Sequence, residues 1–134
     1  MIRDCLIPAL KREFSGWEIT FDTPPHPVAT FPAAQPAVGR VLVYDDGHEA
    51  TIVIENVTHG HFNPGNENLT EDQRDETVTE EVIDFLKALF NDRVLLYSSP
   101  DKRRSGWIQF ESDDGPAELS ESLQYFLWSR PYET

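Results

Sequence analysis

The sequence predicts an α+β fold. We expect an antiparallel-rich sheet of about five to six strands with two helices, in the order α-β-(β)-β-β-α-β-β-β. A capping-box signature, Thr70 followed three residues later by Gln73, opens a run with helical apolar spacing over residues 71–90. Two β-branched runs flank an Asp-Gly turn within residues 38–56, which is a strong hairpin signal. The other apolar segments are short and separated by turn formers, as in sheets with hairpin connections.

The N-terminal segment predicts one helix and one strand. Apolar side chains recur there at helical spacing, at Ile2, Cys5, Leu6, Leu10 and Phe14. Because a helix tolerates proline best in its first turn, Pro8 predicts that the regular helix begins between Asp4 and Leu6. Residues 17–22 alternate apolar and polar side chains, which predicts a half-buried strand.

A proline-rich segment and a hairpin follow. Residues 23–36 hold five prolines, which predicts a stiff connection with a short edge strand at residues 28–31. The hairpin strands, residues 38–44 and 50–54, are apolar on both faces, so we expect them to be central strands in a sheet covered on both faces. Residues 57–66 are rich in turn formers and predict a loop.

The C-terminal part predicts three further strands. Residues 94–98 and 107–111 read as a hairpin. Residues 123–128 fit a helix by their leucine spacing and a strand by their aromatic content, and we favour the strand.

We expect both helices to lie on one face of the predicted sheet. The apolar side chains on the other face therefore need a different cover. The proline-rich segment or a second copy of the chain could cover this face, or the helices could lie on opposite faces. A homodimer is therefore one expected assembly.

Length and composition indicate one small globular unit. The chain has 134 residues, which fits a single domain over residues 1–134. Its only cysteine, Cys5, excludes an internal disulfide. The first residues lack the long apolar run of a signal peptide, and no window is apolar enough to span a membrane, so we expect no membrane association and a cytoplasmic location.

The net charge limits the kinds of molecule that we expect this chain to bind. The formal charge is −13, and residues 67–92 alone hold nine acidic and two basic residues. Such a field repels nucleic acids and anionic membranes at long range and attracts cations. We therefore expect no nucleic-acid partner and regard a basic protein as the most plausible one.

Three carboxylates of the predicted main helix form the candidate docking surface. Glu76, Glu80 and Asp84 follow one another at intervals of four residues, opposite the apolar stripe. Like charges at this spacing destabilise a helix by roughly 0.2–0.5 kcal/mol per pair. They can serve solubility alone, or they can dock a basic partner.

A second candidate site is centred on His59 and His61. Two histidines separated by one residue on an extended backbone point to the same side and can share a metal ion. Glu67 is the expected third ligand, with Glu49 and His48 as alternatives. The pair resembles the His-x-His of cupin metal sites, but the carboxylate spacing differs and no later histidine follows. We expect no bound metal and no other cofactor.

No catalytic motif is present in the sequence. It contains no Gly-x-Ser-x-Gly, no phosphate-binding glycine loop and no Cys-x-x-Cys. The Asp-Asp pairs at residues 45–46 and 113–114 each precede glycine, as turns require without any catalytic demand. We therefore assign no catalytic residue and expect a non-catalytic protein-interaction domain.

Residues 41–108 contain a run of recognisable segments, VLVYDDG, THGHF, EEVIDFLKALFNDRVLLYSS and GW. This stretch resembles small bacterial α+β proteins that have no assigned function, and the resemblance implies no activity and no functional residue. In size, charge and fold class the chain is also similar, by analogy, to the immunity proteins that neutralise basic bacterial toxins.

Overall fold

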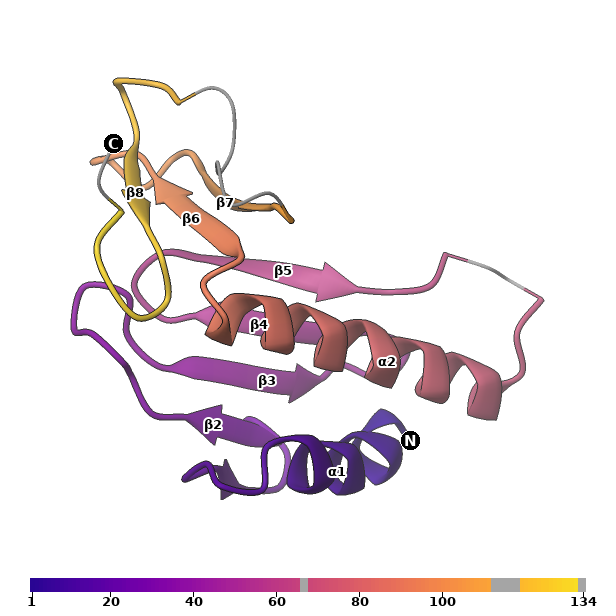
Figure 1. Cartoon of the computed structure of the whole chain (residues 1–134). Helices are drawn as coiled ribbons and strands as arrows, with labels where there is room; N and C mark the ends of the chain where they lie inside the picture. Colours follow the sequence, from indigo (N-terminus) through magenta and orange to yellow (C-terminus); the bar gives the residue numbers. More distant parts are fainter. Residues whose placement is uncertain (66–67, 112–118, 133–134) are drawn as a thin grey trace.

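The structure is a computed structural model, and it describes residues 1–65, 68–111 and 119–132 (Figure 1). The helices are α1 (Ile2–Glu13) and α2 (Glu71–Phe90). The strands are β1 (Thr20–Phe21), β2 (Ala29–Phe31), β3 (Val41–Asp45), β4 (Ala50–Ile54), β5 (Thr58–Phe62), β6 (Val94–Ser98), β7 (Ser105–Gln109) and β8 (Gln124–Phe126). The α+β class is confirmed. The short strand predicted within the proline-rich segment is present as β2, but it pairs with both β1 and β3 and is therefore not an edge strand.

The strands form two antiparallel sheets rather than the one sheet expected. The first has five strands in the order β1-β2-β3-β4-β5, and the second has three in the order β7-β6-β8. Alternation along a strand reveals its faces but not its partners, which is why the sequence did not separate the two sheets.

Strand β5 corrects the expectation of a loop at residues 57–66. It pairs with β4 over five residue pairs, from Ala50↔Phe62 to Ile54↔Thr58. Its inner face carries Thr58, Gly60 and Phe62. The indole of Trp107 on β7 covers Gly60 so closely that a Cβ there would lie 2.1 Å from Cη2. The glycine thus serves a close packing contact and not a turn.

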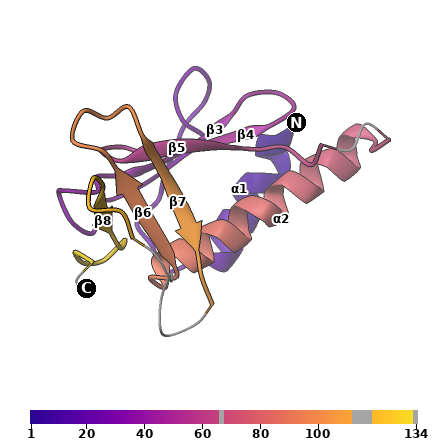
Figure 2. The ribbon, with the colours of Figure 1, turned by 90° about the horizontal axis from the view of Figure 1, so that it is seen from above.

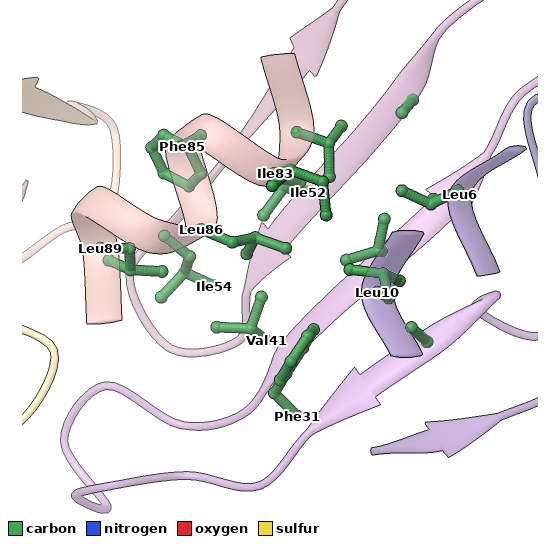
Figure 3. Close-up of a cluster of buried hydrophobic side chains, with 14 of the residues drawn as sticks. Leu6, Leu10, Phe31, Val41, Ile52, Ile54, Ile83, Phe85, Leu86 and Leu89 are labelled. Atoms are coloured by element: carbon green, nitrogen blue, oxygen red, sulfur yellow. The ribbon is translucent and has the colours of Figure 1, made fainter. Parts of the chain in front are cut away.

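Both helices lie on one face of the five-stranded sheet, so the alternative of opposite faces is wrong (Figure 2). The core lies between this face and the helices, where side chains of α2 point toward those of β2, β3 and β4 (Figure 3). Its fully buried members include Leu6, Leu10, Phe31, Val41, Ile52, Ile54, Leu86 and Leu89. On the outer face Leu42, Tyr44 and Val53 are half-buried, so only the inner face has the full cover expected for both.

Helix α1 begins earlier than predicted and keeps Pro8 inside it. The helix starts at Ile2, which places Pro8 in the second turn. Proline lacks the N–H that would bond to the carbonyl of Asp4, so one helical hydrogen bond is missing. The buried Ile2, Leu6, Ala9 and Leu10 give the helix its packing face and offset that loss.

The first strand is shorter than predicted, because only Thr20–Phe21 is paired. Trp17 instead packs beside the end of α1, stacked on Phe90 at a centroid distance of 4.3 Å and edge-on to Phe14 at 5.9 Å. Residues 123–128 contain a strand, as favoured, over Gln124–Phe126.

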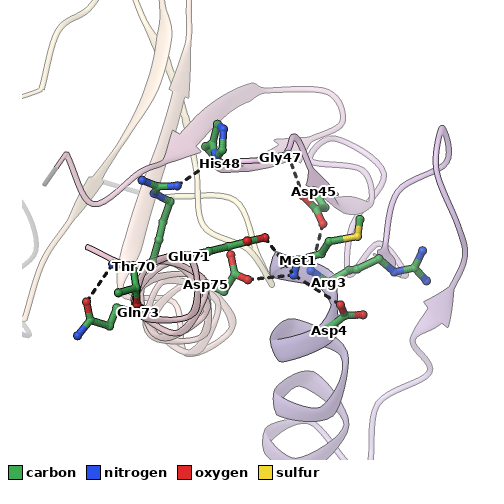
Figure 4. Close-up of polar contacts among 11 residues, drawn as sticks. Met1, Arg3, Asp4, Asp45, Gly47, His48, Thr70, Glu71, Gln73 and Asp75 are labelled. Carbon is green, nitrogen blue, oxygen red and sulfur yellow. Dashed lines mark hydrogen bonds and ion pairs between the residues drawn. The ribbon is translucent and has the colours of Figure 1, made fainter. Parts of the chain in front are cut away.

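Polar contacts hold the beginning of α1 against the β3–β4 turn and α2 (Figure 4). Asp45 accepts hydrogen bonds from the backbone N–H of Arg3 at 3.1 Å and from that of Gly47 at 2.9 Å. The Met1 amino group lies 3.0 Å from the buried carboxylate of Asp75, whose hydrogen bond raises the pKa of that amino group. The predicted capping box is present at the start of α2.

Candidate functional site

The acidic ridge, defined as Glu76, Glu80 and Asp84, lies on the solvent side of α2. All three residues are exposed, while the buried residues of α2 face the sheet and α1. Residues four apart on a helix have their Cβ atoms about 5–6 Å from each other, so the carboxylates form one row. None of the three side chains makes a hydrogen bond or ion pair with another described residue.

Other charged residues of α2 do have partners. Lys87 lies 3.0 Å from Glu13 at the end of α1, and this ammonium group lowers the pKa of Glu13. Asp75 faces the Met1 amino group, and Arg74 contacts Nδ1 of His48 at 3.1 Å. Lys87, three residues after Asp84 in the sequence, is therefore paired with α1 and not with the ridge. The ridge keeps its charge uncompensated within the described part of the chain.

His59 and His61 lie side by side on the outer face of β5, as their spacing predicted. Both are exposed, with ring centroids 5.6 Å apart. Nδ1 of His61 lies 2.9 Å from the hydroxyl of Thr51, which donates to Asp46, and 4.0 Å from a carboxylate oxygen of Glu49.

The metal ligand set is incomplete among the residues that the structure describes. Glu67 lies outside them. Glu49 approaches His61, whereas His48 contacts Arg74 instead. Within residues 1–65, 68–111 and 119–132, no group of three His, Cys, Asp or Glu side chains could hold a metal ion. A structural zinc site takes four ligands, so the histidine pair alone does not make one.

The only cysteine is not placed for nucleophilic chemistry. Cys5 is half-buried on α1. Burial, together with the neighbouring carboxylate of Asp75, raises the pKa of its thiol. The thiolate form that attacks substrates is therefore disfavoured.

The structure also contains a groove that the sequence analysis missed. It lies between the two sheets and has a volume of about 1010 Å³. Its lining comes from four separate segments, contributing among others Ala37, Asn56, His59, Lys102 and Tyr125. No local motif joins these segments, so only the fold reveals the site.

The comparisons found no match for this chain among protein-family models, curated proteins or solved structures. Neither helix in the described part of the chain has the length and apolar character needed to cross a bilayer.

Proposed function

We propose that this chain is a non-catalytic protein-interaction domain that presents its acidic ridge to a basic protein partner. The observation that carries the proposal is the row formed by Glu76, Glu80 and Asp84, exposed along one face of α2 and lacking partners among the described residues. The carboxylates of such a row repel one another and destabilise the helix, and a basic partner bound to the row would remove this repulsion.

The remaining charge of the molecule supports the same partner class. With a net charge of −13, the chain attracts cationic proteins from a distance and raises their rate of encounter. In its sharpest form the proposal is an immunity-like protein that neutralises a basic toxin. That form rests on the analogy of size, charge and fold class.

Capture from a lysate of the source cells tests the proposal. The bait with Glu76→Gln, Glu80→Gln and Asp84→Gln should lose a basic protein that the wild-type bait retains. The matched control carries Glu18→Gln, Glu111→Gln and Glu121→Gln, which removes the same charge from exposed positions elsewhere. If both triple variants retain the partner equally, or both lose it equally, the ridge is not the docking surface.

The alternative function is a metal- or small-ligand-binding protein, or an enzyme of that kind, centred on His59 and His61. A specific observation favours only its small-ligand form, because His59 lines the groove between the sheets. The metal form has two histidines and no third ligand among the described residues.

A further inference from the structure

The groove between the two sheets has the form of a small-molecule site. One side is the β4–β5 turn with Asn56 and the first residues of β5. Opposite it lie the β6–β7 hairpin, which carries Lys102, and strand β8, which carries Tyr125. Its volume of about 1010 Å³ is at the upper end of the range typical of ligand pockets, roughly 300–1,000 Å³.

Lys102 places a positive charge in this groove. Its ammonium group donates to the carbonyl oxygen of Asn56 at 3.2 Å and lies 3.5 Å from the hydroxyl of Ser98. An ammonium has three N–H donors, so one remains for a ligand. No carboxylate among the described residues forms an ion pair with Lys102.

Two acidic residues, one in the groove lining and one next to Lys102 in the sequence, already have partners. Glu55, which also lines the groove, forms an ion pair with Arg40 at 2.6 Å. Asp101, the residue before Lys102, accepts hydrogen bonds from the hydroxyl of Ser99 at 2.6 Å and from the backbone N–H of Arg103 at 3.1 Å. The positive charge of Lys102 is therefore the charge that a ligand in the groove would meet.

The backbone holds Lys102 in an unusual conformation. Its φ angle is 63°, in the left-handed region that residues other than glycine rarely adopt. The hairpin fixes it there, because the N–H of Lys102 donates to the carbonyl of Ser99 at 2.9 Å and the N–H of Ser99 donates to that of Arg104 at 2.7 Å. Strain of this kind, held by its surroundings, is found preferentially at functional sites.

Strand β8, on the same side of the groove as Lys102, adds aromatic residues to the lining. Tyr125 is half-buried, and its hydroxyl accepts a hydrogen bond from the backbone N–H of Ser120 at 2.7 Å. Its ring packs beside that of Tyr97, with the centroids 6.3 Å apart. Phe126 and Val53 extend the apolar lining. The lining thus combines one cation with apolar and aromatic residues.

We propose that this groove binds a small organic anion, with its carboxylate or phosphate on the ammonium of Lys102 and its apolar body against Phe126 and Val53. The site is separate from the acidic ridge on α2 and does not depend on it. The ligand charge is opposite to that of the partner proposed for the ridge, so the two sites select different molecules.

Titration of the ¹⁵N-labelled full chain followed by NMR tests this proposal. The probes are phenyl phosphate and benzoate, with benzyl alcohol as a neutral molecule carrying the same ring. We expect both anions to cause saturable shifts at Asn56, His59, Lys102 and Tyr125, with dissociation constants on the order of a millimolar for ligands of this size. If benzyl alcohol binds the wild-type chain as tightly as the anions do, or if neither anion causes a saturable shift, the proposal is overturned.

A pair of variants separates the site from the general charge of the hairpin. Lys102→Gln should weaken binding of both anions about tenfold, because it removes a charge-assisted hydrogen bond. Arg103→Gln removes the same charge from the neighbouring residue, which does not line the groove, and should leave binding unchanged. Equal weakening by the two variants, or unchanged binding in Lys102→Gln, would also overturn the proposal. The ratio of the wild-type dissociation constants for phenyl phosphate and benzoate shows whether the groove prefers a phosphate or a carboxylate.

Discussion

At the scale of single residues, Gly60 explains the composition of the segment that looked most like a chemical motif. Gly60 lies on the side of β5 that faces Trp107. The ring centroid of Trp107 is 4.5 Å from that of Phe85 and 6.1 Å from that of Phe62. His59 and His61 occupy the alternate positions, which face outward. The His-Gly-His pattern is thus accounted for by a strand with a glycine under an indole and polar residues toward solvent.

Gly60→Ala should therefore destabilise the fold. The new methyl group would overlap the indole of Trp107, and overpacking of this kind costs about 1–3 kcal/mol of unfolding free energy. Urea unfolding measures the loss. Gly16→Ala is the matched control, because no atom lies within 4 Å of its added Cβ, and it should cost nothing. Similar stabilities for the two variants would contradict the packing role of Gly60.

The histidine pair gives a second prediction at this scale. Since the described residues supply no third ligand for His59 and His61, we expect zinc, nickel and manganese to leave the melting temperature unchanged. A metal that bound only the folded state would raise it. A rise of several degrees in the wild type that disappears in His59→Ala would instead establish a metal site and restore the enzyme hypothesis.

At the scale of elements, α2 combines a stable frame with an unfavourable charge row. The capping box fixes its first turn, and six buried apolar residues attach it to the core. This packing explains how the helix tolerates the acidic ridge, since tertiary burial outweighs the repulsion of like charges at its surface.

Glu80→Lys should raise the stability of the isolated chain. The change replaces two repulsive contacts, with Glu76 and Asp84, by two attractive ones, each worth roughly 0.2–0.5 kcal/mol. Urea unfolding at low ionic strength should show the gain, and salt should reduce it. As a control, Glu80→Gln should give a smaller gain. Destabilisation by Glu80→Lys would mean that the carboxylate of Glu80 has a structural role.

The link between the two helices should be sensitive to acid. The hydrogen bond and charge of Lys87 lower the pKa of Glu13 below its ordinary value of 4.5. A carboxylate with a lowered folded-state pKa stabilises the protein above pH 4.5, and this contribution is lost as the pH falls through the folded-state value. Glu13→Gln should therefore reduce the unfolding free energy at pH 7 and have little effect well below pH 4. An equal effect at both pH values would contradict the ionic role.

The helices and the hairpin were the elements most readable from sequence. The capping box and apolar stripe predicted α2, and the Asp-Gly turn predicted β3 and β4. Strand β5 was not predicted, because Gly60 and the following Asn-Pro-Gly are typical of a loop. The contact between Gly60 and the indole of Trp107, which explains the glycine, forms only in the folded protein. Because of Pro8, the start of α1 was predicted too late in the sequence. In the structure the helix begins at Ile2, since tertiary packing outweighs the loss of one hydrogen bond.

At the scale of the whole molecule, the two candidate sites differed in how far sequence could predict them. The acidic ridge follows from helical periodicity alone, so its residues and exposure could be predicted. The groove could not, because Lys102, Asn56 and Tyr125 meet only when the two sheets pack together.

The homodimer stays a prediction, and the outer face of the five-stranded sheet is where it would form. Leu42, Tyr44 and Val53 lie half-buried there. Two chains of net charge −13 repel each other, so we expect sedimentation to show the mass of two chains increasingly as salt screens that repulsion. A single species of 15.3 kDa at every salt concentration would contradict the dimer.

If the acidic ridge docks a basic protein, the rate of association with the captured partner should depend on the charge of the ridge. Surface plasmon resonance across a series of salt concentrations would compare the wild type with Glu80→Lys. We predict slower association for the variant and a flatter dependence of its rate on salt, because a charge at the docking surface has been reversed. An association rate and a salt dependence equal to those of the wild type would contradict docking at the ridge.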